Sequence, residues 1–143
     1  MNQQVRPDIT SMLAPDGPLV RDILAAIPDV LAIYAFGSRV DGTAHDESDL
    51  DLAVLVAGYA DPVRLWMLAG DLAGKVHCDV DLLDMRAAST IMQHQILMTG
   101  RRLWARNLDA DLFECFVLSE KTALDEARAG LLIDIRERGK IYG

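Results

Sequence analysis

The feature that most constrains this chain is a polar stretch between two short apolar runs. Residues 30–36 and 50–56 are rich in branched and aromatic side chains, which is typical of β-strands. Gly37-Ser38 directly follows the first run, and Asp49-Leu50-Asp51 opens the second after ten intervening residues. The pattern predicts two strands joined by a turn and a polar loop, with carboxylates at the start of the second strand.

The two aspartates have the spacing of a metal-binding pair. On a strand, Asp49 and Asp51 project from the same face, about 6.6 Å apart along the chain, while Leu50 points to the other face. Two carboxylates so close repel each other unless a cation lies between them. Magnesium suits such a pair, since it takes one or two protein carboxylates and completes its shell with phosphate oxygens. A second ion would allow both ends of a phosphoryl displacement to be polarised.

Gly37-Ser38 supplies the features of a phosphate site. Glycine lets the backbone approach a ligand closely, and a helical turn over residues 39–43, capped by Ser38, would direct free N–H groups at an anion. Arg39 either adds a fixed positive charge or is simply solvated. Together with the aspartates, this stretch indicates a nucleoside triphosphate site.

A third carboxylate is available on a later predicted strand, over residues 77–83. Asp79 and Asp81 share one face of that strand. If it lies beside the second strand, either residue could complete the metal site or deprotonate an attacking hydroxyl. Strand parity alone does not choose between them.

Composition indicates one globular domain. The chain has 143 residues, a net charge of −8 and no apolar run long enough to cross a bilayer, so we expect a cytoplasmic protein. The acidic balance disfavours direct nucleic-acid binding; it suits either solubility or a basic partner. Cys78 and Cys115 fit no metal spacing and are expected to be reduced, buried thiols.

Hydrophobic periodicity predicts the remaining elements. We expect a flexible leader over residues 1–17 and one domain over 18–143, of α+β class, with a small mixed sheet flanked by helices. Trp66 and Met67 are expected in the core, and Leu112, Phe116 and Leu131 on one stripe of a long C-terminal segment. The pattern of that segment predicts either one long helix or two consecutive helices. The other predicted elements are helices over 18–27, 61–76 and 87–97 and a short edge strand over 102–105.

The ordered motifs resemble those of the nucleotidyltransferase superfamily related to DNA polymerase beta. Gly37-Ser38, ten residues and Asp49-Leu50-Asp51 match its first signature, and residues 80–84 (Val-Asp-Leu-Leu-Asp) match the strand that carries its third acid. The short length, residues 97–101 and the ending 138–143 are similar to the minimal nucleotidyltransferase (MNT) antitoxins paired with HEPN toxins.

The resemblance implies a specific chemistry. Asp49, Asp51 and Asp81 would be catalytic and would hold magnesium, in two ions, while Gly37, Ser38 and Arg39 would contact ATP. AMP would pass from ATP to a tyrosine hydroxyl of a HEPN ribonuclease toxin, which would thereby be neutralised. The chain would therefore form a hetero-oligomer with that toxin, and it would not bind a membrane.

Two other functions remain open at the level of sequence. A non-catalytic antitoxin could neutralise its toxin by binding alone, and a nucleotidyltransferase could act on a small molecule or RNA. The C-terminal stripe either covers the sheet or docks a partner helix. His45, in the loop between the two motif halves, and Tyr142, near the end, have no assigned role.

Overall fold

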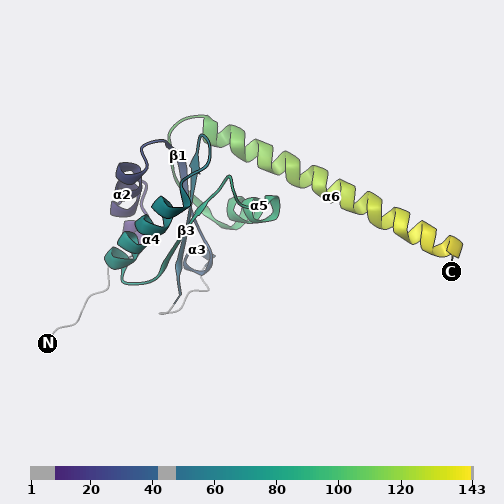
Figure 1. Ribbon diagram of the computed structural model, residues 1–143, viewed down its shortest axis with the longest axis horizontal. Coiled ribbons are helices and arrows are strands. Elements are labelled where there is room, and N and C mark those ends of the chain that lie inside the picture. Colours follow the sequence, from purple (N-terminus) through teal and green to yellow (C-terminus); the bar gives the residue numbers. More distant parts are fainter. Residues whose placement is uncertain (1–8, 42–47, 143) are drawn as a thin grey trace.

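The computed structural model describes residues 9–41 and 48–142. Figure 1 shows a small sheet with helices on both faces and one long helix that leaves the domain. In chain order, the elements are α1 (Ile9–Met12), α2 (Pro18–Ala26), β1 (Val30–Phe36), α3 (Ser38–Asp41), β2 (Leu50–Val56), α4 (Pro62–Val76), β3 (Val80–Asp84), α5 (Thr90–Thr99), β4 (Arg101–Ala105) and α6 (Asp109–Tyr142).

The sheet is mixed, as predicted. Its strand order is β3-β2-β1-β4, with β1 antiparallel to both of its neighbours and β2 parallel to β3. The two motif-bearing strands, β1 and β2, are therefore central, and β3 and β4 form the edges. The α+β class expected from the sequence is confirmed.

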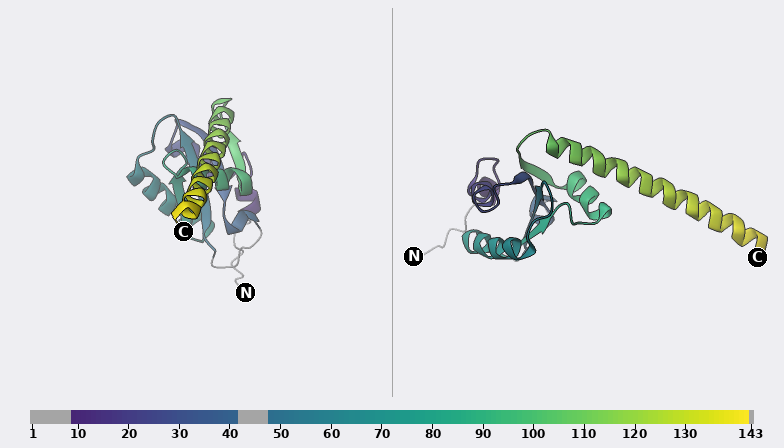
Figure 2. Two further views of the ribbon diagram at one scale, coloured as in Figure 1. Left: turned by 90° about the vertical axis from the view of Figure 1, so that its right-hand side faces the viewer. Right: turned by 45° about the horizontal axis from the view of Figure 1, so that its top comes forward.

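Alternation along the strands divides the core into two layers. Leu50, Leu52 and Val54 of β2 pack with α2 and α4, whereas Ala53 and Leu55 pack on the opposite face with α5 and the start of α6. Figure 2 shows α2 and α4 on one side of the sheet and α5 and α6 on the other. Asp51 therefore belongs, by parity, to the α5/α6 face.

Helix α6 covers the sheet with only its first turns. Ala110, Phe113 and Val117 are buried. The whole helix has 34 residues and is about 50 Å long, and most of it projects from the domain (Figure 1). Gly130 does not interrupt it. No helix in the described ranges is both long and apolar enough to span a membrane.

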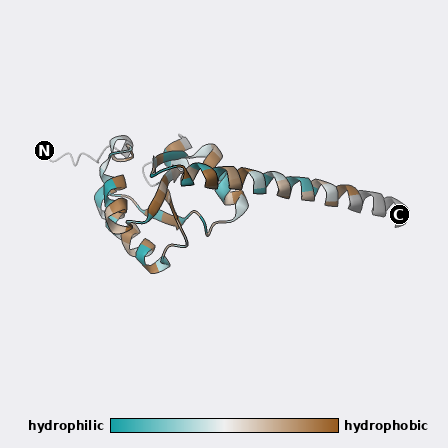
Figure 3. Ribbon diagram, turned by 90° about the horizontal axis from the view of Figure 1, so that it is seen from above, coloured by the Kyte–Doolittle hydropathy of each residue, from teal (hydrophilic) through white to brown (hydrophobic). Residues whose placement is uncertain are grey.

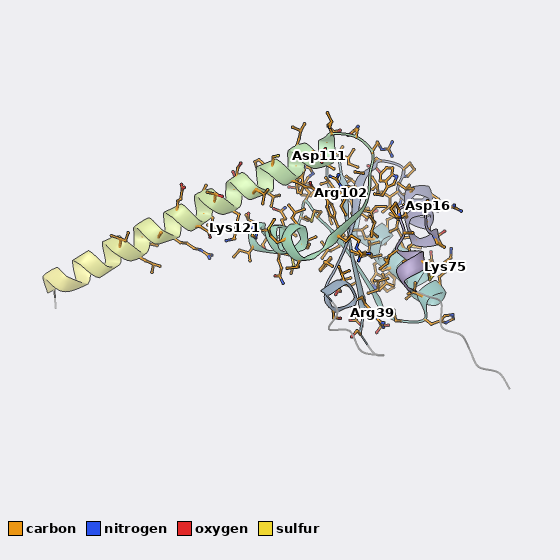
Figure 4. All side chains as sticks on the ribbon, turned by 180° about the vertical axis from the view of Figure 1, so that it is seen from behind. Asp16, Arg39, Lys75, Arg102, Asp111 and Lys121 are labelled. Carbon is orange, nitrogen blue, oxygen red and sulfur yellow. The ribbon has the colours of Figure 1, made fainter. Side chains whose placement is uncertain are left out.

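Polar contacts fasten the start of α6 to the sheet. The buried Tyr34 hydroxyl donates to Glu114 Oε1 at 2.9 Å, and Arg102 on β4 bonds to Asp111 Oδ1 at 2.6 Å and to Glu114 Oε2 at 3.3 Å. Figure 4 shows Arg102 and Asp111 side by side. Burial, followed by the hydrogen bond to Glu114, raises the pKa of Tyr34, so this phenol stays a donor at neutral pH.

Several boundaries differ from the predictions. The described part of the expected leader contains α1, and Leu13 is buried in the core, so this segment is not flexible throughout. Strand β3 starts at Val80 rather than at residue 77, because His77 adopts a left-handed conformation (φ 57°) that ends α4. Helix α5 starts at Thr90 rather than at residue 87, because the Ser89 side chain caps it by accepting from Met92 N.

Some side chains expected in the core are exposed. Trp66 is 78% and Met67 61% exposed, because Leu65, Leu68 and Leu72 form the buried face of α4. The α6 stripe of Leu112, Phe116 and Leu131, which was expected either to cover the sheet or to dock a partner helix, is exposed. Of the two cysteines expected to be buried, Cys115 is exposed and Cys78 is half-buried. Figure 3 shows hydrophobic positions along the projecting helix.

Candidate active site

The register of the sheet brings the motif residues to one place. In the parallel pair, Asp51 on β2 lies directly opposite Asp81 on β3. On its other side, Asp51 lies opposite Phe36, the last residue of β1, which immediately precedes Gly37. Residues far apart in the sequence thus converge where β1 ends and where β2 and β3 begin.

Gly37 packs directly against the Asp51 carboxylate. Its φ of +79° is one that residues with a side chain rarely adopt, and a Cβ built on it would lie 2.1 Å from Asp51 Oδ2. The backbone here can approach the carboxylate only because no side chain intervenes. The predicted approach of this backbone to a phosphate stays a prediction.

Arg39 is tied to the strand that carries the aspartates. Its Nε and one terminal nitrogen donate to the carbonyl oxygen of Ser48 at 3.1 and 2.8 Å. Ser48 is buried and immediately precedes Asp49, so Arg39 braces the entry to β2. Figure 4 shows Arg39 on α3, at the end of the sheet away from Asp111. Ser38 opens the four-residue helix α3 and lies inside it, so it is not the N-cap that was predicted.

Carboxylates crowd Asp51. Burial raises its pKa, and the neighbouring charges of Asp81 and Asp49 raise it further. Asp49 and Asp81 are exposed while Asp51 is half-buried. The site is therefore negatively charged, accessible to solvent and built from hard oxygen donors, which is the chemistry that suits magnesium.

The described residues do not form a complete metal cage. No three His, Cys, Asp or Glu side chains among them are arranged to hold an ion by themselves. The donor set still fits magnesium, because this ion typically uses one or two protein carboxylates and takes its other ligands from water and substrate phosphates.

Asp79 and Asp81 occupy different positions. Asp81 is the residue opposite Asp51, whereas Asp79 precedes β3 and its carbonyl accepts from Leu50 N at 2.9 Å. Asp81 also contributes to the raised pKa of Asp51. Of the two, Asp81 is thus the one that lies beside Asp51, and its role as the third acid stays a prediction. His45 and the side chain of Tyr142 lie outside the described part of the chain.

A cleft beside this site was not indicated by the sequence pattern. It has a volume of about 590 Å³ and lies between α4 and the outer edge of β3, with Asp81 among its lining residues. Tyr59 and Trp66, 75% and 78% exposed, line it. The sequence did contain a sign of this cleft: bulky apolar residues on the face of α4 that does not carry Leu65, Leu68 and Leu72. From the sequence, those residues were expected in the core.

The fold and the paired carboxylates define the class as a nucleotidyltransferase. The family model for polymerase beta nucleotidyltransferases matches residues 20–109, and the chain belongs to this family. It is 39% identical over 109 residues to the protein adenylyltransferase MntA of Shewanella oneidensis, covering 76% of this chain and 78% of that protein.

Solved structures agree with this assignment. One chain in a crystal structure of a toxin–antitoxin pair with AMP-PNP is 37% identical, with a TM-score of 0.73 over 82% of this chain and 94% of that one. Another, from the tri-AMPylated Shewanella oneidensis HEPN toxin in complex with its MNT antitoxin, is 33% identical, with a TM-score of 0.67 over 82% and 92%.

Gly37→Ala tests the close packing at the site. The new Cβ would overlap Asp51, and alanine would have to adopt the left-handed backbone conformation that Gly37 has. We therefore expect a loss of roughly 1–2 kcal/mol or more in the free energy of unfolding. Gly70→Ala is the matched control, because a Cβ there meets nothing within 4 Å on helix α4 and should stabilise by about 0.5–1 kcal/mol. Urea denaturation measures both; equal effects would contradict the packing.

Asp51→Asn tests the carboxylate crowding. A raised folded-state pKa gives stability at low pH that is lost as pH rises through that pKa. The metal-free Asn variant should therefore be more stable than the original chain near pH 7, and the difference should shrink as pH falls to about 4, close to the ordinary aspartate pKa. Urea denaturation at several pH values, with chelator, measures this.

Asp125→Asn provides a control of opposite sign. The hydrogen bond from Lys121 lowers the pKa of Asp125, so this exposed carboxylate contributes stability above its ordinary pKa and loses it as pH falls. Its removal should leave stability near pH 7 unchanged or slightly reduced. A difference between Asp51→Asn and the original chain that does not vary with pH would rule out the crowding.

Proposed function

We propose that this chain is a magnesium-dependent protein adenylyltransferase that moves AMP from ATP to a tyrosine hydroxyl of a HEPN ribonuclease toxin, and so neutralises it. The observation that carries the proposal is the Asp51–Asp81 pairing packed against Gly37, in a chain related to MntA. The complexes with AMP-PNP and with an AMPylated HEPN toxin support both substrates. The reaction would take place in the cytoplasm, where ATP and an RNA-cleaving toxin meet.

In the proposed reaction, the acceptor oxygen attacks the α-phosphorus of ATP. The new O–P bond forms as the bond between the α-phosphorus and the bridging oxygen breaks, and pyrophosphate leaves with that electron pair. Asp81 accepts the hydroxyl proton, since it lies at the accessible margin of the site. The Gly37-Ser38 backbone holds the triphosphate, and Arg39 keeps Asp49 in position through Ser48. Catalysis of this kind depends mainly on positioning and charge stabilisation.

Asp49, Asp51 and Asp81 are the residues that would hold magnesium. When bound, the metal would neutralise charge on the phosphates and relieve the repulsion that raises the pKa of Asp51. Two ions would suit three carboxylates.

Helix α6 is the surface that we assign to the toxin. Beyond Val117 it leaves the domain, and Leu131, Leu132 and Ile133 are each more than half exposed (Figure 1). Apolar residues on a projecting helix are suited to packing against partner helices. The net charge of −8 further suits a partner with a basic, RNA-binding surface.

The same observations favour a second function, neutralisation by binding alone. A chain that docks through α6 could block a ribonuclease without any transfer. The carboxylate cluster discriminates the two functions, because it has no part in docking through α6.

Replacing the carboxylates separates catalysis from binding. Asp49→Asn, Asp51→Asn and Asp81→Asn should each lower AMP transfer roughly 100-fold or more, because each removes a charge that stabilises the transition state. Intact-mass spectrometry of the toxin, after incubation with ATP and magnesium, measures the transfer. Asp71→Asn, exposed on α4, is the control and should transfer normally.

Two outcomes decide between the functions. If the unaltered chain adds no AMP to the toxin, the enzymatic proposal is wrong. If the Asp49→Asn/Asp51→Asn double variant still protects cells from the toxin, binding alone is sufficient for neutralisation.

Changes on α6 test the docking surface. Leu131→Asp with Leu132→Asp should weaken toxin binding roughly tenfold or more, measured by isothermal titration calorimetry, and leave the free energy of unfolding within about 0.5 kcal/mol. Met98→Asp, an equally exposed apolar site on α5, is the matched control. Unchanged affinity in the α6 variant would place the interface elsewhere.

A further inference from the structure

Strand β3 has a free edge next to the catalytic carboxylates. It is the terminal strand of the described sheet, bonded only to β2. At its two ends, the carbonyl of Asp79 accepts from Leu50 N at 2.9 Å, and Met85 N donates to the Val54 carbonyl at 2.8 Å. The odd-numbered residues of this strand therefore direct their backbone groups at β2.

The even-numbered residues then direct their backbone groups outward, since these groups alternate along a parallel strand. Val80 and Leu82 thus present N–H and C=O groups at the free edge, and no described residue bonds to them there. Edge groups of this kind form a template for another extended chain.

The cleft described above runs along this same edge; we call it the α4–β3 groove. Its apolar lining comes from α4, the segment before it and β3: Tyr59, Pro62, Leu65, Trp66, Val80 and Leu82. Asp81 is among its lining residues and lies beside Asp51, its register partner on the neighbouring strand. The groove is therefore continuous with the candidate active site.

We propose that the acceptor segment of the protein substrate binds as an extended strand along the free edge of β3. Its apolar side chains would enter the α4–β3 groove, and its acceptor hydroxyl would lie on the face that carries Asp51 and Asp81. This inference rests on the proposed function and specifies how that function selects its acceptor.

Strand geometry makes the match specific. An added strand lies about 4.8 Å from its neighbour, and its side chains alternate between the two faces. When the acceptor points to the Asp81 face, the residues immediately before and after it point to the α4 face, where Trp66 and Leu65 lie. A shift of one residue would carry the acceptor to the wrong face. Apolar residues should therefore flank the acceptor on both sides.

The groove suits a peptide better than a triphosphate. Its lining residues include no Lys or Arg and do include Asp81 and Asp84. Main-chain edge groups with an apolar pocket beside them are the features used in strand addition. Occupation by the adenine ring of ATP is the alternative that the experiment separates.

The test compares two α4 variants by steady-state AMP transfer to the full-length toxin. Trp66→Ser removes an exposed groove residue, so the fold should be kept, and we expect the KM for toxin to rise roughly tenfold or more with the KM for ATP unchanged. Val63→Ser, similarly exposed on α4 but outside the groove lining, is the matched control and should keep both KM values.

A second pair isolates the backbone edge. Val80→Pro removes one outward N–H, a change that an edge strand tolerates, while Val80→Ala keeps it. We expect the kcat/KM for toxin to be at least tenfold lower for the Pro variant than for the Ala variant. Amide hydrogen exchange at Leu82 in the unaltered chain should also slow when toxin is added.

Each outcome is decisive. If Trp66→Ser raises the KM for ATP and leaves that for toxin, the groove holds the nucleotide and strand addition is wrong. If the unaltered chain transfers AMP, and Trp66→Ser and Val80→Pro both behave like their controls, strand addition is wrong while the proposed function stands. If the unaltered chain transfers no AMP, the proposed function fails and this inference fails with it.

Discussion

The parallel pairing of β2 with β3 is the constraint on which the site depends. It sets Asp51 opposite Asp81 and concentrates negative charge where the apolar sheet begins. Without a cation, these neighbouring negative charges repel each other. The two hydrophobic layers of the surrounding sheet hold them in place. The close approach of Gly37 and the contact between Arg39 and Ser48 fix the position of this pair from the side of β1 and α3.

Local pattern was enough to predict the strands that position the candidate carboxylates. Side chains alternate between the two faces of any strand. Assigning β2 as a strand was therefore enough to place Leu50 and Leu52 in one core layer and Asp51 on the other face. Choosing between Asp79 and Asp81 required the register of two strands separated by α4. That register depends on how long-range packing aligns the strands, which periodicity does not encode.

The wrong core assignment in α4 and the two alternatives left open for α6 have a common physical cause. Helix α4 carries apolar residues on two faces, and only the one with Leu65 and Leu72 meets the sheet. In α6 the stripe with Phe116 points to solvent, while Phe113 and Val117 pack. A hydrophobic stripe indicates that something covers it, but its sequence does not say whether that cover is the same chain or another.

The register of β3 also links correct folding to the position of the site carboxylates. Moving this strand by one residue would turn Asp81 towards the layer that holds Leu82, Leu52 and Leu72, and so bury a charge among hydrocarbon side chains. Such a misaligned sheet would be unstable and would also separate Asp81 from Asp51. Molecules that fold should therefore almost all carry Asp51 beside Asp81, with no long-lived population of well-folded but misaligned chains.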